Sequence, residues 1–411
     1  MTATARHEAM TRWAALAVLL LYPGFFLYHA AVGILGLPAV LGGYYGTVSA
    51  ALLTLAAAAA LPALLRGHTV LGWLDLGFLA LCGLVAAWSL AYHRLGAPYQ
   101  RESALLAQSF AMIGLWSVNY LAFRHLDLGT PLLRWGLALA AAAVVAIVLA
   151  HQVDGLFQPS IASTATAERL VATYQGFARS AFVVFLCLLA TARAGWLPWI
   201  LGIGLATLVV LGARSEFLGF ILAGGTIAML RLRDLRPHHV LLPALVACWW
   251  LWAGIEWPIS GNVRISNLAN LASDGSYLTR MELTRHAWRT VRGAPLLGDY
   301  GSYVLVGGLG SYAHNALSAW VNFGFAGFLA FGWMMGVSCR RALLGVGGQI
   351  ARQPQALFAV GLVVHLVLMA FTAKALMYPL FAAGWGAAAG LVRIDRKRRD
   401  AVPSRVDGVP A

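Results

Sequence analysis

Long apolar runs alternate with short polar connectors along almost the whole chain. A membrane-spanning helix needs about 20 mainly apolar residues, and twelve runs meet or approach that length. They are residues 13–35, 40–65, 70–92, 103–123, 132–150, 177–194, 196–213, 215–231, 239–256, 312–338, 355–372 and 375–392. The pattern predicts an all-α, polytopic membrane protein with about twelve transmembrane helices and a large, partly helical loop between the ninth and the tenth.

The composition supports this interpretation. Of the 411 residues 60% are hydrophobic and 11% are charged, and the mean hydropathy is +0.75. A soluble domain has about 45–50% apolar and about 25% charged residues, so a water-soluble enzyme and a disordered protein are both excluded. The cysteines are few, far apart and inside or beside apolar runs, which favours buried thiols over a disulfide framework or a zinc site.

Positive charge marks the predicted topology. The net charge is +14, and Lys374 and Lys397 are the only lysines. In a soluble protein, an excess of basic residues would suggest nucleic-acid binding. In a membrane protein, basic residues mark the cytoplasmic loops, so no nucleic-acid partner is expected. With the N-terminus inside, 18 of the 29 basic residues fall on the cytoplasmic side. Both termini are therefore predicted to be cytoplasmic, and the first run is predicted to be an uncleaved helix rather than a signal peptide.

The spans divide the chain into four parts. Residues 1–256 carry helices 1–9, residues 257–311 form an extracytoplasmic loop, residues 312–394 carry helices 10–12, and residues 395–411 form a basic cytoplasmic tail. Two outward segments, 151–176 and 257–311, exceed the length of simple connectors, and loops that long are usually functional or disordered. Function is therefore expected on the outer face, which is periplasmic if the membrane is the inner membrane of a Gram-negative bacterium.

An amphipathic helix is predicted within the second long loop, over residues 278–292. Arg285, Arg289 and Arg292 share its polar face, which suits contact with water or lipid headgroups. Arg280 alone lies in the middle of the apolar face, which is formed by Met281, Leu283, Ala287, Trp288 and Val291. A guanidinium aimed at a helix bundle needs an anion, because an unpaired buried charge is costly.

Three further cations stand at the predicted outer boundary. Arg214 lies in a turn with almost no loop, where Ser215 is expected to cap the next helix and a surface pair with Glu216 is the plain alternative. Lys374 lies in the short outer turn between the last two spans, and Arg179 lies near the outer start of its helix. These two are weaker candidates for binding an anion.

His314 is predicted to begin the tenth span, where the positive end of the helix dipole disfavours imidazolium. A neutral imidazole there can accept a proton, with Asn315 and Ser318 as polar neighbours; an interfacial histidine bonded to a carbonyl is the alternative. His29 and His365 lie within spans and are expected to make structural bonds between helices.

The chain lacks the motifs of metal or nucleotide chemistry. No Asp-x-Asp pair lies on the outer face and no usable P-loop is present, so neither a metal nor a cofactor is expected. The outer face also lacks ATP, so a substrate must arrive already activated. A lipid-linked diphosphate sugar would supply the energy and the anion that Arg214 and Arg280 require, and arginine forks can neutralise the departing diphosphate.

Several of these residues form a recognisable series. The series is Ser276-Tyr-Leu-Thr-Arg280, Trp288, the segment APLLGDYG at 294–301, the segment AHNAL at 313–317, Gly324 and Gly327. It resembles the O-antigen ligase/polymerase superfamily, whose usual order is Ser-x-x-x-Arg, Pro-x-x-Gly, His-Asn and Gly-x-x-Gly. The Ala-Arg-Ser at 213–215 is similar to the Ser-Arg element of the family, with Ala213 in place of the serine. The motifs cover about 115 residues.

The resemblance implies a GT-C-type inverting glycosyltransferase that uses an undecaprenyl-diphosphate-linked glycan without a metal. Arg214 and Arg280 would then bind the diphosphate, with Arg179, Lys374 and Asn315 as further binding candidates, and His314 would deprotonate or orient the acceptor hydroxyl. The leading hypothesis is an O-antigen ligase with a lipid A–core acceptor. A surface-polysaccharide polymerase uses the same donor and stays open, as do protein O-glycosyltransferases and, from another class, a flippase for the same lipid-linked sugar.

Overall fold

The computed structural model describes residues 3–41, 43–65, 71–159, 174–252, 275–345, 353–373 and 375–401. Within these ranges the protein is helical apart from one short antiparallel hairpin, β1 (Gln152–Val153) and β2 (Leu156–Phe157). The predicted all-α, polytopic membrane architecture is confirmed.

Each predicted span coincides with a helix or a helical run. The helices are α1 (Ala3–Leu19), the π-helical turn η1 (Leu20–Gly24), α2 (Phe25–Leu35), α3 (Tyr44–Leu65), α4 (Trp73–Leu95), α5 (Ser103–His125), α6 (Pro131–Ala150), α7 (Tyr174–Thr191), α8 (Leu197–Leu211), α9 (Arg214–Leu230), α10 (Pro237–Trp252), α14 (Leu317–Gly345), α15 (Pro354–Thr372) and α16 (Leu380–Ala401). Among the described residues, eight helical runs are long and apolar enough to cross a membrane, counting α1 to α2 as one. Helices α9 and α10 are shorter, with 17 and 16 residues.

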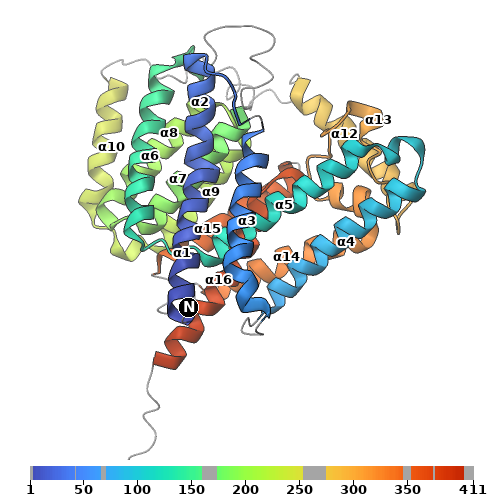
Figure 1. The fold of residues 1–411 in the computed structure, drawn as a ribbon. Helices are drawn as coiled ribbons and strands as arrows, with labels where there is room; N and C mark the ends of the chain where they lie inside the picture. The colour runs from blue at the N-terminus through green and yellow to red at the C-terminus, as the bar shows by residue number, and fades with distance from the viewer. Residues whose placement is uncertain are drawn as a thin grey trace, which may run out of the picture.

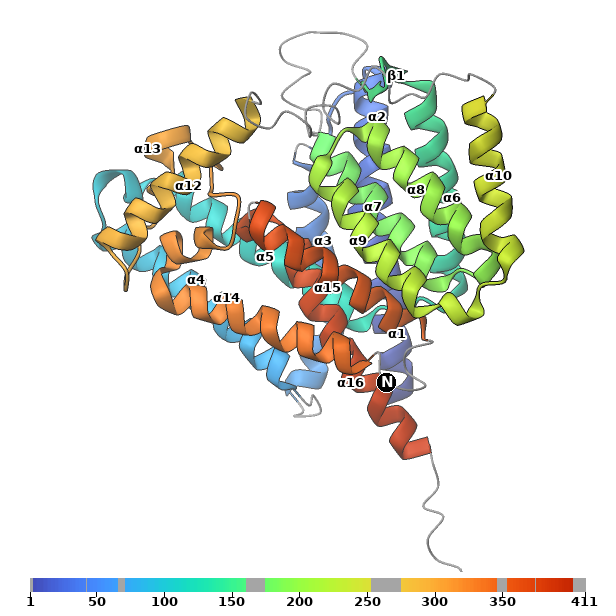
Figure 2. The ribbon, with the colours of Figure 1, turned by 180° about the vertical axis from the view of Figure 1, so that it is seen from behind.

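The helices form two groups that meet along α15 and α16 (Figures 1 and 2). Helices α2 and α6 to α10 stand side by side in one group, whereas α4, α5 and α14 are inclined in the other. Helix α16 packs on α5 and α15 packs on α9, which joins the groups. The N-terminus and the end of α16 lie at one end of the molecule, away from α12 (Gly275–Gly293) and α13 (Val304–Gly307). We call the opposite end of the molecule the α12 end.

A buried ion pair connects α4 to α5. Both oxygens of Asp75 are bound by Arg124, with nitrogen–oxygen distances of 2.7 Å, and the Tyr120 hydroxyl donates to Asp75 at 2.6 Å. Two charges taken out of water need this degree of saturation, because an unpaired buried carboxylate would be strongly destabilising. The pair therefore acts as a polar anchor inside an otherwise apolar packing of helices.

Helix α14 is broken near its start, and the break receives the loop that follows α12. Phe323 and Gly324 have non-helical torsion angles, and the φ of Gly324 is 65°. The loop 294–301 binds this break with main-chain hydrogen bonds in both directions. Asp299 N donates to Val321 O at 2.7 Å, and Phe325 N donates to Leu296 O at 3.0 Å. We call this contact the loop–kink interlock.

Side chains reinforce the loop–kink interlock, and two glycines make it possible. Trp320 Nε1 donates to Pro295 O at 2.7 Å, and Gly301 N donates to Asn322 Oδ1 at 3.1 Å. Gly298 has a φ of 66°, and a methyl group on it would collide with the carbonyl oxygens of Val321 and Trp320. A methyl group on Gly324 would collide with Leu296 O. The Pro-x-x-Gly and Gly-x-x-Gly elements of the sequence are thus two halves of one contact.

The glycines of the loop–kink interlock give the first prediction. Gly298→Ala and Gly324→Ala should each destabilise the protein, because a left-handed conformation costs an L-residue about 1–2 kcal/mol and the backbone must also move. We expect a lower midpoint of thermal unfolding in detergent. Gly332→Ala is the matched control, since it lies in the same helix with open space around it and alanine favours a helix. Equal midpoints for all three variants would contradict the role assigned to the interlock.

Candidate active site

A cavity of about 120 Å³ lies at the α12 end and contains Arg280 and His314. It is built from five separate segments of the chain. The first turns of α7 and α9 contribute Gln175, Arg179, Ser215 and Glu216, and the connection from α15 to α16 contributes Thr372, Ala373, Met377 and Tyr378. Two cations and an imidazole therefore face one enclosed space.

A main-chain hydrogen bond and a small apolar cluster position His314 and Arg280. Ala316 N donates to Ala370 O at 2.7 Å, so the segment that carries His314 is attached to the last turn of α15. Ala287 and Val291 of α12 are buried against Ala313 and Val321. Because Arg280 lies on the same helix, this small apolar cluster and the loop–kink interlock together set its position relative to His314.

A buried hydrogen-bond chain forms one wall of the cavity. The Tyr378 hydroxyl donates to Glu216 Oε1 at 3.4 Å, and Ser215 Oγ donates to Glu216 Oε2 at 2.7 Å. His365 Nε2 lies 2.7 Å from the same Tyr378 oxygen. Glu216 and His365 are both buried, and sequence analysis correctly expected His365 to make a structural bond.

Arg179 adds a cation to this wall. Its guanidinium carbon lies 4.5 Å from the centre of the Tyr378 ring, and its charge interacts with that of Glu216. A cation over an aromatic face is attracted by the ring quadrupole. Burial, and then the nearby Glu216 carboxylate, raise the pKa of Tyr378 well above its usual value, so its hydroxyl keeps the proton that it donates.

Some of the predicted site residues line the cavity, and others do not. Arg280, His314 and Arg179 line the cavity, whereas Arg214 stands next to it, directly before the lining residue Ser215. The side-chain oxygen of Asn315 accepts the Leu317 amide at 3.1 Å at the start of α14, and Asn315 is not among the lining residues. Lys374 lies outside the described residues.

Three local expectations were wrong. Ser215 does not cap α9, because the helix already begins at Arg214 and the hydroxyl donates to Glu216. Glu216 is not part of a surface pair, since its residue is only 1% exposed. His314 precedes the helix rather than beginning it, since α14 starts at Leu317, which weakens the expected influence of the helix dipole.

Helix α12 follows its predicted amphipathic pattern with two exceptions. Arg285, Arg289 and Arg292 are exposed on one face, and Leu283, Ala287 and Val291 are buried on the other. Trp288 and Met281 were placed on the apolar face but are 46% and 36% exposed. At about 100° per residue both lie at the boundary between the faces, where periodicity does not decide burial.

The contribution of Tyr378 and the burial of Glu216 were not predicted from the sequence. Glu216 follows Arg214 and Ser215 in what looks like a polar turn, and Tyr378 lies 162 positions further along the chain. A carboxylate at the start of an apolar run was the available signal, because such a charge is retained only where it finds a partner. Among the described residues no group of three or more histidine, cysteine or acidic side chains could hold a metal ion.

Comparison with known proteins adds little. No protein-family model matches the chain, and no curated protein matches its sequence. A chain of the solved structure described as "Structural coordination of polymerization and crosslinking by a peptidoglycan synthase complex" is 17% identical, with a TM-score of 0.40, over 78% of this chain and 98% of its own length. A likeness this distant carries no argument, and the resemblance of the short motifs to the O-antigen ligase/polymerase superfamily stays a prediction.

The hydrogen-bond chain gives the second prediction. Tyr378→Phe should lower the free energy of unfolding by about 1–3 kcal/mol, because Glu216 and His365 lose a partner in a buried place. Thermal unfolding in detergent, followed by intrinsic fluorescence, measures the change. Tyr92→Phe is the control, since the Tyr92 hydroxyl makes no hydrogen bond to a described residue. If the two variants unfold at the same temperature, the hydrogen bonds of Tyr378 contribute nothing to the stability of the protein.

Proposed function

We propose that the protein is a membrane glycosyltransferase that takes a glycan from an undecaprenyl-diphosphate carrier, with lipid A–core as the acceptor and the inner membrane of a Gram-negative bacterium as its location. The observation that carries this proposal is the cavity in which Arg280, Arg179 and His314 come together from three distant segments of the chain. Two guanidinium groups suit a diphosphate, because each can bind phosphate oxygens with two parallel hydrogen bonds. An imidazole beside cations is favoured in its neutral form, which can accept a proton.

The proposed reaction is a single displacement. His314 takes the proton of the acceptor hydroxyl as its oxygen attacks the anomeric carbon of the glycan. The bond from that carbon to the diphosphate oxygen breaks, and its electron pair leaves with the undecaprenyl diphosphate. Arg280 and Arg179 neutralise the charge that develops there, with Arg214 adjacent at the positive end of α9, where helix dipoles favour anions. One displacement inverts the anomeric configuration and uses no metal.

One observation favours transfer over transport. Arg280 and His314 line one cavity, with Arg214 directly before its lining residue Ser215, instead of following a path through the spans. A flippase for the same lipid-linked sugar would need polar residues at several depths. Residues that bind the donor do not separate a ligase from a polymerase, since both use this donor, and the acceptor decides between them.

Two substitutions test the proposed chemistry. His314→Ala should reduce transfer by about 100-fold to 10,000-fold, the usual contribution of a general base. Arg280→Lys should reduce it by about ten-fold or more, because a bidentate fork becomes a point charge. Transfer from carrier-linked glycan to acceptor is measured with purified protein, with and without a chelator.

Matched variants separate chemistry from folding in this assay. His151→Ala and the exposed Arg94→Lys lie outside the cavity lining and should keep full transfer. Full activity of Arg280→Lys would exclude bidentate phosphate binding at that position. A strict requirement for added divalent metal would exclude the arginine mechanism.

A deletion strain tests the choice of acceptor. Loss of a ligase should leave lipid A–core bare while carrier-linked polymer accumulates, whereas loss of a polymerase should leave core capped by one repeat. Electrophoresis of lipopolysaccharide and extraction of carrier lipids measure both outcomes. A strain with unchanged lipopolysaccharide would contradict both assignments.

A further inference from the structure

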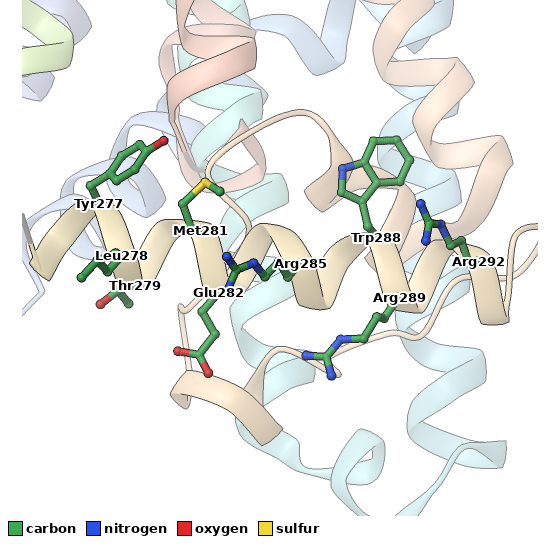
Figure 3. Close-up of a pocket in the computed structure, with 9 residues that line it drawn as sticks. All are labelled: Tyr277, Leu278, Thr279, Met281, Glu282, Arg285, Trp288, Arg289 and Arg292. Atoms are coloured by element: carbon green, nitrogen blue, oxygen red, sulfur yellow. The ribbon is translucent and has the colours of Figure 1, made fainter. Parts of the chain in front are cut away.

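Helix α12 also borders a second hollow, whose described lining residues differ from those of the cavity. This hollow is an open groove of about 1140 Å³, and its described lining residues all belong to this one helix. Figure 3 shows Tyr277, Met281 and Trp288 projecting from one edge of the helix, with Arg292 beside Trp288 and Arg289 on the other edge. The same helix therefore contributes to two separate hollows, since Arg280 lines the cavity.

The groove is open, and its reverse side is fixed. Each described residue that lines it is exposed, so no other described part of the chain covers this face. Leu283, Ala287 and Val291 on the reverse side are buried. Since these residues are held against the bundle, the exposed side chains stand on a firm support rather than on a free segment.

The charge of the groove selects an anion. Three arginines, Arg285, Arg289 and Arg292, line it with one acid, Glu282, so the formal charge is +3 − 1 = +2. No ion pair joins any of the three arginines to an acidic side chain within the described residues. Adjacent guanidinium groups that repel one another are best satisfied by a ligand with more than one negative group. Phosphate is the anion whose geometry guanidinium forks match best.

The aromatic residues of the groove indicate which further groups its ligand carries. Trp288 and Tyr277 are 46% and 37% exposed, so within the described part of the chain much of each ring faces water. Rings with an apolar face and a polar edge are typical of recognition surfaces, where they pack against flat, partly apolar groups. The faces of sugar rings are such groups, and arginines beside them would bind phosphates attached to the sugars.

We propose that the groove binds the phosphorylated glycan of the acceptor and holds it while its terminal hydroxyl reaches His314. This inference rests on the proposed function, because it names the acceptor class of the same site. Trp288 and Arg280 are eight residues apart, so they are about 12 Å apart along the helix axis at 1.5 Å per residue. A short oligosaccharide spans that length. One helix would thus set the distance between the anchored part of the acceptor and the bound diphosphate.

The decisive variant removes charge without touching the cavity. The triple substitution Arg285→Gln, Arg289→Gln and Arg292→Gln changes exposed side chains on a helix whose buried face is intact. We expect the KM for a phosphorylated acceptor to rise about ten-fold, with unchanged kcat and unchanged KM for the donor. With an acceptor whose phosphates have been removed, wild type and variant should have the same KM. Arg94→Gln, an exposed arginine outside the groove, is the control and should behave as wild type.

Ionic strength provides an independent readout. Exposed charges are screened over about 10 Å at 0.1 M salt, so added salt should raise the acceptor KM of wild type and leave that of the triple variant nearly unchanged. An equal salt dependence in both proteins would overturn the inference. So would an unchanged KM in the triple variant, although wild-type transfer would then still support the proposed function.

A direct binding experiment separates the two proposals. Phosphorylated core oligosaccharide, freed from its lipid, is titrated into the full-length protein in detergent without any donor. Binding that the triple variant loses supports the groove even if no transfer from a polyprenyl donor is found. If the oligosaccharide does not bind, and the triple substitution instead weakens association with vesicles rich in anionic phospholipid, the face contacts the bilayer and the inference is wrong.

Discussion

The structure of the site depends on the loop–kink interlock. Helix α12 carries Arg280 but is too polar to span a membrane, so contacts with the rest of the protein must position it. The interlock supplies them by exchanging main-chain hydrogen bonds between the loop 294–301 and the break in α14. His314 stands just before that same helix. The loop–kink interlock therefore helps to set the separation of Arg280 from His314, although neither residue takes part in the interlock.

The cavity lined by Arg280, Arg179 and His314 shows how a membrane protein keeps several cations close together. Arg179 and Arg280 would repel each other in a medium of low dielectric constant, and the buried carboxylate of Glu216 offsets part of that repulsion. Glu216 is itself kept in place by Ser215 and Tyr378, with His365 behind them. Glu216 thus balances part of the positive charge from within the protein, although its carboxylate would repel a diphosphate. Such an arrangement keeps cations available for the proposed anion without storing an uncompensated charge.

The sequence was sufficient for the spans because the bilayer imposes one rule on every segment. Apolar length decides a transmembrane helix, and each predicted span overlaps a helix, although the first helix begins ten residues before its predicted span and the last ends nine residues after it. Misplaced charge also identified Arg280, since an arginine inside an apolar stripe has few explanations. Long-range pairing could not be predicted in the same way. Nothing local connects Tyr378 with Glu216, and nothing in a helical wheel decides whether a boundary residue such as Trp288 is buried.

Helix α12 shows why one amphipathic pattern can serve two purposes. A helix that only covered a bundle would need a uniform polar face, and a helix that only presented Arg280 would need no aromatic residues in water. Instead the arginines divide between two hollows, with Arg280 lining the cavity and Arg285, Arg289 and Arg292 lining the groove. Because a helix is stiff over this length, anything bound on one face is held at a fixed offset from the other. Orientation of two reactants can contribute as much to a rate as chemistry does, and a rigid element shared by both is the simplest means of providing it.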